Sequence, residues 1–261
     1  MTSARVVRQG TMRPMTKDPM SHRIALFIDF ENLVTRTGLS PEKFDVQPML
    51  DLLLEKGKVV YRRAYCDWTR FSAAKQGLHD QGIELMEVPP STRAGKNSAD
   101  IRLVIDALEL AYQREHIDTF AVASGDSDFC PLVYKLREND RQVIGMGVRE
   151  ATSPLLVKAC DEFLYLKTAP KGGAKATRES ARPKVVPAIA REVAAGILAK
   201  ATGPVNPSFI KEAIVRKQPD FDEHDSGFSS FNRLLEAMEK EGLLKREQTA
   251  KGQWYVVPPE R

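Results

Sequence analysis

Apolar runs and segments with helical periodicity alternate along residues 23 to 167. Several runs are uninterrupted, which is typical of strands buried on both faces of a parallel sheet. The expected strands span residues 23–30, 59–65, 83–88, 119–124, 142–147 and 163–166, and the expected helices span 47–55, 69–81, 98–115, 128–138 and 154–160. Strands that alternate with helices predict an α/β domain with a mostly parallel sheet and helices on both faces.

The helix expected at 98–115 has the clearest periodicity. Its apolar residues recur at helical spacing and form one stripe, made by Ile101, Val104, Ile105, Leu108 and Ala111. Such a stripe is typical of the face that a helix buries.

A second, smaller unit is expected after a linker. Residues 168–187 are rich in Pro, Gly, Ala, Ser and basic residues and have no apolar periodicity, which is typical of a linker. Beyond it, helices are expected at 188–202, 208–217 and 228–241, and strand-like runs at 243–248 and 253–257 flank a Gly-containing turn. Three helices and a hairpin predict a winged-helix domain over 188–258, after a leader at 1–22 and a main domain at 23–167.

The positive charge of the chain is concentrated outside these expected domains. The whole chain has a formal charge of +4, whereas the leader has +3 and residues 168–187 have +4, so the remainder is net negative. Basic segments of this kind suit a polyanion such as nucleic acid, although they also serve as solubilising spacers.

Cysteine usage and hydropathy indicate a cytoplasmic protein. Cys66, Cys130 and Cys160 are widely spaced in apolar surroundings and lack the paired spacing of zinc or redox motifs. We expect them to be reduced and mostly buried. No stretch approaches the ~18 continuous apolar residues of a membrane span, and the N-terminal segment lacks the apolar core of a secretory signal.

Four aspartates stand where a parallel sheet brings separate strands to one edge. Asp29 ends the first apolar run, Asp126 and Asp128 follow the run at 119–124, and Asp100 lies in the first turn of the 98–115 helix. Ligands in open α/β sheets bind beyond the carboxyl ends of the strands. Carboxylate oxygens without nearby His or Cys favour Mg²⁺ or Mn²⁺ over zinc. The alternative is that these acids only cap helix starts, each stabilising by ~0.3–1 kcal/mol.

Helical geometry separates Asp100 from Asp106. Six residues at ~100° each place the two side chains ~240° apart around the helix, so both cannot point into one site. Asp100 is the better ligand candidate, and Asp106 is expected to be a supporting or surface group. The loop before this helix places Arg93 and Lys96 where they could grip a phosphate backbone, although such residues are often only solvated.

Three ordered blocks surround the candidate aspartates: FIDFENL around Asp29, KNSAD ending at Asp100, and SGDSDF containing Asp126 and Asp128. Together they closely resemble the signatures of NYN domains, the LabA-like branch of the PIN-like nuclease superfamily. The resemblance covers residues 23–167 and implies a Rossmann-like sheet, a Mg²⁺ or Mn²⁺ centre and cleavage of RNA. It implies that these four aspartates hold metal and that Asn32 and Ser124 orient ligands or water.

The C-terminal segment resembles the OST-HTH, or LOTUS, module over residues 186–258. The resemblance rests on apolar helices, the block FSSF at 228–231, Gly242-Leu243-Leu244 and the closing strand Trp254-Tyr255-Val256. It implies a winged helix that binds RNA or protein. The candidate phosphate contacts are Lys211, Arg216, Lys217, Lys245, Arg246 and Lys251.

These patterns favour a metal-dependent endoribonuclease to which the winged helix delivers RNA. The chain lacks both the P-loop and GxGxxG patterns, and its histidines show no triad or ligand spacing. The alternative function is a non-catalytic RNA-binding or regulatory adaptor. A protein partner at the C-terminal module and self-association both remain open.

Overall fold

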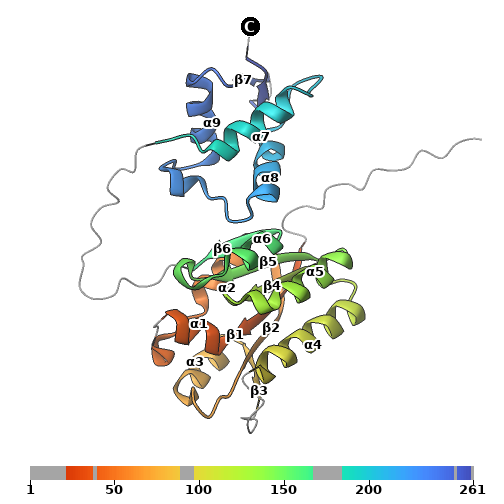
Figure 1. The fold of residues 1–261 in the computed structure, drawn as a ribbon, viewed down its shortest axis with the longest axis vertical. Coiled ribbons are helices and arrows are strands. Elements are labelled where there is room, and N and C mark those ends of the chain that lie inside the picture. The colour runs from red at the N-terminus through yellow and green to blue at the C-terminus, as the bar shows by residue number, and fades with distance from the viewer. Residues whose placement is uncertain (1–21, 38–39, 89–96, 167–183, 250–251, 260–261) are drawn as a thin grey trace, which may run out of the picture.

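The computed structural model describes residues 22–37, 40–88, 97–166, 184–249 and 252–259. Its main domain is a six-stranded parallel sheet with the order β3-β2-β1-β4-β5-β6 (Figure 1). The strands are β1 (Arg23–Asp29), β2 (Lys58–Cys66), β3 (Glu84–Glu87), β4 (Thr119–Ala123), β5 (Gln142–Gly147) and β6 (Glu162–Tyr165). The expected α/β fold with a parallel sheet is confirmed. The order places β1 beside β4, where the chain changes its direction of winding across the sheet.

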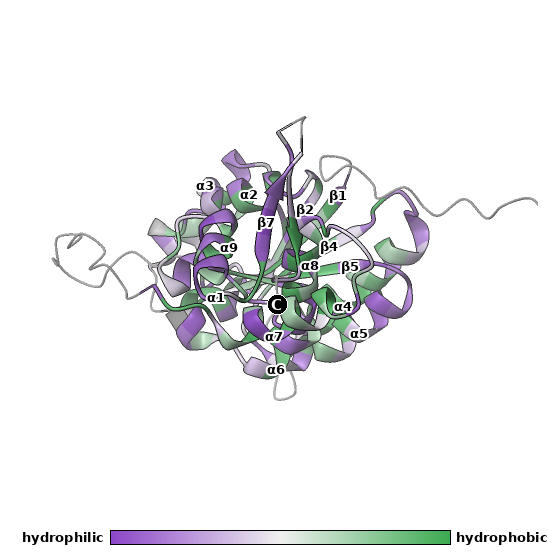
Figure 2. Cartoon of the chain, turned by 90° about the horizontal axis from the view of Figure 1, so that it is seen from above, coloured by the Kyte–Doolittle hydropathy of each residue, from purple (hydrophilic) through white to green (hydrophobic). Residues whose placement is uncertain are grey.

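Helices cover both faces of this sheet (Figure 1). The helices α1 (Phe30–Thr37), α2 (Gln47–Leu54) and α3 (Lys75–Asp80) pack against Ile24, Leu26 and Ile28 of β1. The helices α4 (Ser98–Gln113), α5 (Cys130–Glu138) and α6 (Pro154–Ala159) pack against Ala25 and Phe27 on the opposite face. Figure 2 shows hydrophobic positions on the central strands and hydrophilic positions on the outer helices. Successive side chains of β1 point to opposite faces of the sheet, so this strand contributes to both hydrophobic cores.

Several element bounds differ from the sequence prediction. The strand expected to reach Phe30 ends at Asp29, because Asp29 Oδ1 accepts a hydrogen bond from the Asn32 N–H and starts the unpredicted helix α1. The helix expected at 69–81 is a turn and a short 3₁₀ segment before α3, and the helix expected from Asp128 begins at Cys130. Asp126 caps the 3₁₀ turn that precedes Cys130, whereas no described side chain caps α3. Periodicity does not resolve the ends of helices to the residue.

The apolar stripe expected on α4 is only partly buried. Ile101 and Ile105 are 58% and 54% exposed, whereas Leu103, Ala107 and Ala111 face the core. The buried face also contains the carboxylate of Asp106. The sequence pattern pointed to the wrong face of α4 because the face that is buried carries the charged residue Asp106.

The C-terminal unit, residues 184–259, consists of α7 (Ala188–Leu198), α8 (Pro207–Lys217), α9 (Phe231–Lys240) and the antiparallel strands β7 (Lys245–Gln248) and β8 (Trp254–Val257). The arrangement of three helices and a hairpin is therefore confirmed, with α9 starting three residues later than expected because Ser230 caps it. Phe228 and Phe231 lie in its core. Trp254 instead is partly exposed beneath the guanidinium of Arg246.

The C-terminal unit contacts the edge strand β6. The Phe163 N–H donates to the Pro219 carbonyl at 2.8 Å, and the Tyr165 hydroxyl donates to Asp220 Oδ2 at 3.2 Å. Arg149, which follows β5, lies over the Tyr165 ring and donates to Asp225 at 2.7 Å. These contacts cover part of an edge that would otherwise present unpaired backbone groups.

No helix in the described ranges combines the length and the apolar character that a bilayer crossing requires. The three cysteines carry free thiols; Cys66 and Cys160 are buried and Cys130 is half-buried.

Candidate functional site

The centre of the site is a hydrogen bond between the ends of two neighbouring strands. Ile28 of β1 pairs with Ala123 of β4, so Asp29 and Ser124 emerge side by side at the carboxyl edge of the sheet. Both residues are buried, and the Ser124 hydroxyl donates to Asp29 Oδ2 at 2.8 Å. Residues 95 positions apart in sequence are thereby joined directly.

Asn32 connects the same two loops a second time. Its backbone N–H donates to Asp29 Oδ1 at 3.2 Å, and its side-chain Oδ1 accepts from the Gly125 N–H at 3.1 Å. The Asp126 N–H in turn donates to Ser124 Oγ at 3.2 Å. Asp29 therefore does cap α1, as the alternative interpretation held, but it also anchors the loop that leads to Asp126.

Gly125 allows this loop to pass close to the segment after β5. A Cβ atom at this position would lie 2.3 Å from the Ala151 carbonyl oxygen, which is backbone and has little room to move. The Gly125 carbonyl also accepts from the Ser153 N–H at 2.9 Å. Only glycine allows this backbone approach.

Asp126 and Asp128 lie at the start of the 3₁₀ turn that leads into α5. Asp126 Oδ1 accepts from the Asp128 N–H at 3.1 Å, so Asp126 serves as a cap through one oxygen. Asp126 is half-buried and Asp128 is exposed. Both aspartates follow the carboxyl end of β4, and one oxygen of Asp126 is already used by the cap.

Asp100 shares an electrostatic field with these aspartates. It lies half-buried in the first turn of α4, where burial and then the charges of Asp126 and Asp128 raise the pKa of its carboxyl group. Burial and then the charge of Asp100 raise the pKa of Asp29 to about 7. Such mutual influence requires proximity, because screened charges interact over only ~10 Å at ordinary salt.

The chemistry of this acidic group fits a hard divalent cation. Its donors are all carboxylate oxygens, and burial together with the neighbouring carboxylates raises the pKa of Asp29 and of Asp100. Within the described ranges, however, no three acidic, His or Cys side chains are grouped closely enough to hold an ion. The expected metal-sized pocket of Asp29, Asp100 and Asp126 is therefore not found in this structure.

Glu31 also belongs to this acidic neighbourhood, although the sequence analysis did not include it. Burial raises the pKa of Asp100 and of the Cys66 thiol, and the charge of Glu31 adds to both shifts. Its carboxylate pairs with Arg70 at 2.5 Å. Glu31 lies two residues beyond Asp29, which ends β1, and this position was the sequence signal that could have identified it.

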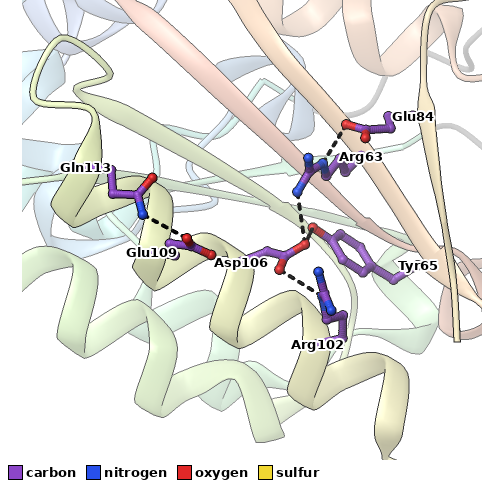
Figure 3. A network of polar contacts seen from close by, with 7 residues as sticks. All are labelled: Arg63, Tyr65, Glu84, Arg102, Asp106, Glu109 and Gln113. Atoms are coloured by element: carbon purple, nitrogen blue, oxygen red, sulfur yellow. Dashed lines mark hydrogen bonds and ion pairs between the residues drawn. The ribbon is translucent and has the colours of Figure 1, made fainter.

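Asp106 is a structural residue and not a surface group (Figure 3). It is 4% exposed, and its carboxylate accepts hydrogen bonds from Arg63 at 3.0 Å, Tyr65 at 3.0 Å and Arg102 at 2.9 Å. The network ties α4 to β2. Asp106 was expected to be a supporting or a surface group, and the surface alternative was wrong because its partners Arg63 and Tyr65 come from a distant part of the chain. The prediction that Asp106 points away from Asp100 agrees with these partners.

Five of the six basic residues proposed for the C-terminal unit fall in the described ranges, and each of these five lies beside a carboxylate. Lys211 pairs with Glu223, Arg216 with Glu212, Lys217 with Glu192, Lys245 with Glu247, and Arg246 with Glu239 and Glu236. Any phosphate would have to compete with these acids. Arg93, Lys96 and Lys251 lie outside the described residues, as does most of the basic leader and linker.

The raised pKa of Asp29 predicts a pH-dependent stability in metal-free protein. An acid whose native pKa of about 7 exceeds its ordinary pKa of 3.8 favours the fold while protonated, and this contribution is lost as the pH rises through about 7. In EDTA at pH 8, Asp29→Asn should therefore unfold at higher urea concentration than the wild type. The difference should disappear near pH 4. A gain of equal size at both pH values would show that the ionisation of Asp29 is not its cause.

Comparison with known proteins assigns the main domain to a family. The model of the NYN domain matches residues 23–167. The uncharacterized protein MJ0482 of Methanocaldococcus jannaschii is 30% identical over 145 residues, which cover 56% of this chain and 55% of that protein, so the chain spans about half of this relative. A solved structure of VPA0982, a protein of unknown function from Vibrio parahaemolyticus, matches 59% of this chain and 97% of its own at 25% identity and a TM-score of 0.49. The chain belongs to the NYN family, within the PIN-like nuclease superfamily.

Proposed function

We propose that the protein is a metal-dependent endoribonuclease that hydrolyses RNA phosphodiester bonds in the cytoplasm. The observation that carries the proposal is the bond from Ser124 to Asp29, which joins the ends of β1 and β4 beside Asp126. A nuclease family and an acidic group at the ligand-binding edge of the sheet support the same chemistry. We also propose that the main domain belongs to the LabA-like branch of NYN domains.

Asp29, Asp100, Asp126 and Asp128 would hold Mg²⁺ or Mn²⁺. When bound, the ion supplies a nucleophilic water at neutral pH and neutralises charge on the phosphate. Ser124 and Asn32 orient the acidic residues: Ser124 fixes one oxygen of Asp29, and Asn32 holds the Gly125 backbone beside it. These bonds restrain the carboxylates before substrate arrives.

The experiment that tests this function is incubation of purified protein with structured and unstructured RNA, with and without Mn²⁺. Cleavage that requires both the metal and Asp126 supports the nuclease. RNA binding without cleavage under any metal condition would instead favour the adaptor. Cleavage of a circular RNA, which has no ends, would distinguish endonucleolytic from exonucleolytic action.

One observation favours the adaptor as a second candidate. The carboxylates beside all five described basic candidates of the C-terminal unit reduce its attraction for RNA. The same unit also contacts β6 through Asp220 and Asp225, which are acidic. A unit whose basic side chains are paired with carboxylates, and which also makes contacts through acidic side chains, is suited to protein contacts as well as to RNA.

We propose an OST-HTH or LOTUS-type winged helix for this unit, with RNA as its ligand. A protein that ends at Lys167 should then keep metal-dependent cleavage but bind RNA more weakly and with a smaller salt dependence. It loses the charge of the linker together with the unit, and each lost phosphate contact removes ~0.7 from the slope of log affinity against log salt. RNA affinity across a salt series measures both quantities.

A full-length variant with Lys211, Arg216 and Lys217 changed to Ala serves as the matched comparison. A drop in slope similar to that of the shortened protein locates the RNA contacts in α8, and an unchanged slope locates them in the linker. Identical affinities and slopes for the shortened and full-length proteins would remove RNA from the role of this unit and leave a protein partner.

A further inference from the structure

A rigid turn after β2 presents Arg70 at the same edge of the sheet as the acidic group. Asp29 of β1 pairs with Tyr65 of β2, so the residues after Cys66 continue beside the end of β1. Within the turn, Asp67 Oδ1 accepts from the Thr69 N–H at 3.0 Å, and the Arg70 N–H donates to the Asp67 carbonyl at 3.2 Å. These bonds hold Arg70 on a defined backbone.

Two buried aromatic residues anchor the turn on either side of Arg70. The Trp68 indole N–H donates to the Met86 carbonyl at 3.0 Å, and its ring packs on Phe30 with a centroid separation of 5.1 Å. Phe71 meets the same Phe30 ring edge-on at 5.5 Å. Because Phe30 directly follows Asp29, the position of the turn is tied to the position of the proposed metal ligand.

The side chain of Arg70 extends across to Glu31 and remains accessible. Its Nη1 lies 2.5 Å from Glu31 Oε1, and its side chain is 57% exposed. Its guanidinium carbon also lies 5.4 Å from the centre of the Phe71 ring. Glu31 therefore orients the guanidinium plane and takes a hydrogen bond from only one of its two terminal nitrogens.

Stability alone gives little reason for this arrangement. An exposed ion pair contributes only ~0–1 kcal/mol. The acidic group, by contrast, repels a phosphodiester, and a guanidinium is the side chain best suited to bind one because its five donors match phosphate oxygens in pairs. The ordered turn gives a cation a fixed place next to the charges that need compensation.

We propose that Arg70 is a phosphate-binding residue at the rim of the acidic site, oriented by Glu31, and that it holds a phosphodiester group of bound RNA. This inference rests on the proposed function for its ligand. It adds a binding residue that the three sequence blocks do not contain.

RNA binding measures this role without requiring cleavage. In full-length protein carrying Asp126→Asn, a fluorescent single-stranded RNA is titrated across a KCl series. Arg70→Ala should weaken binding about tenfold at low salt and reduce the salt slope by ~0.7, the value of one phosphate contact on a single strand. Arg70→Lys should keep the slope, since it keeps the charge, but recover only part of the affinity.

Lys135→Ala is the matched control. Lys135 is 50% exposed and pairs with Glu138 at 2.7 Å in the last turn of α5, away from the carboxyl ends of the strands. It should change neither affinity nor slope. A loss in Lys135→Ala equal to that in Arg70→Ala, or a wild-type slope in Arg70→Ala, would overturn the assignment of Arg70.

Cleavage assays in the Asp126-containing protein keep the two proposals distinct. If the protein shows metal-dependent cleavage and Arg70→Ala keeps the wild-type salt slope, the nuclease proposal stands and the proposed phosphate site at Arg70 is rejected. An Arg70-dependent slope in a protein that never cleaves RNA leaves the phosphate site and removes the nuclease. A protein that neither binds nor cleaves RNA removes both.

Discussion

Asp126→Asn should lower metal-dependent RNA cleavage by roughly 100-fold or more, because even residues that only support metal ligands cost ~10–100-fold when changed. RNA binding should survive or become tighter, since one negative charge near the phosphates is removed. The amide retains an oxygen that can accept from the Asp128 N–H, so the 3₁₀ turn is preserved. Single-turnover cleavage rates and RNA affinity, measured on the same preparations, check both parts.

Glu138→Gln is the control for this prediction. Glu138 ends α5, the helix that follows Asp126, and its exposed carboxylate pairs only across one helical turn with Lys135. The change should leave the cleavage rate within about twofold of the wild type, because salt screens the effect of an exposed charge at the far end of α5 on the acidic site. Full activity in Asp126→Asn, or equal losses in both variants, would contradict the assignment of Asp126.

Asp106→Ala should lower the free energy of unfolding by about 3 kcal/mol, which is typical when one partner of a buried ion pair is removed. The change leaves Arg63 of β2 without its buried acceptor and leaves the Tyr65 hydroxyl without the oxygen that it donates to. Arg63 keeps its contact with Glu84, which limits the loss. Urea unfolding followed by circular dichroism measures the effect.

Glu109→Gln provides a control on the same helix (Figure 3). Glu109 lies on the exposed side of α4 and accepts only a hydrogen bond from Gln113, so its change should stay within ~0.5 kcal/mol. A double variant that replaces Arg63 and Asp106 together by Met and Leu should recover much of the stability, because apolar residues often substitute well for a buried pair. Equal stability of Asp106→Ala and Glu109→Gln would show that the buried network contributes little.

The local sequence was sufficient for the strands and for the acidic candidates. Apolar runs, several of them uninterrupted, indicated the strands of the main domain, since strands buried on both faces of a parallel sheet typically read in this way. The aspartates were found because each directly follows a run or opens a helix. The helix α1 was missed, because its start depends on a side-chain cap from Asp29 and not on apolar periodicity.

The order of the strands and the partners of each charged residue were decided only by the tertiary structure. Periodicity shows that Asp29 and Ser124 end strands, but their hydrogen bond depends on β1 pairing with β4 across 95 positions of sequence. Periodicity does not decide between a supporting and a surface role for a carboxylate such as Asp106, because burial of a charge becomes favourable only when distant partners such as Arg63 neutralise it. The same holds for Arg70 and Glu31, which lie 39 positions apart and meet because adjacent parallel strands end at one edge. Residue types and their spacing thus determined which groups reach that edge, and long-range packing determined which of them meet.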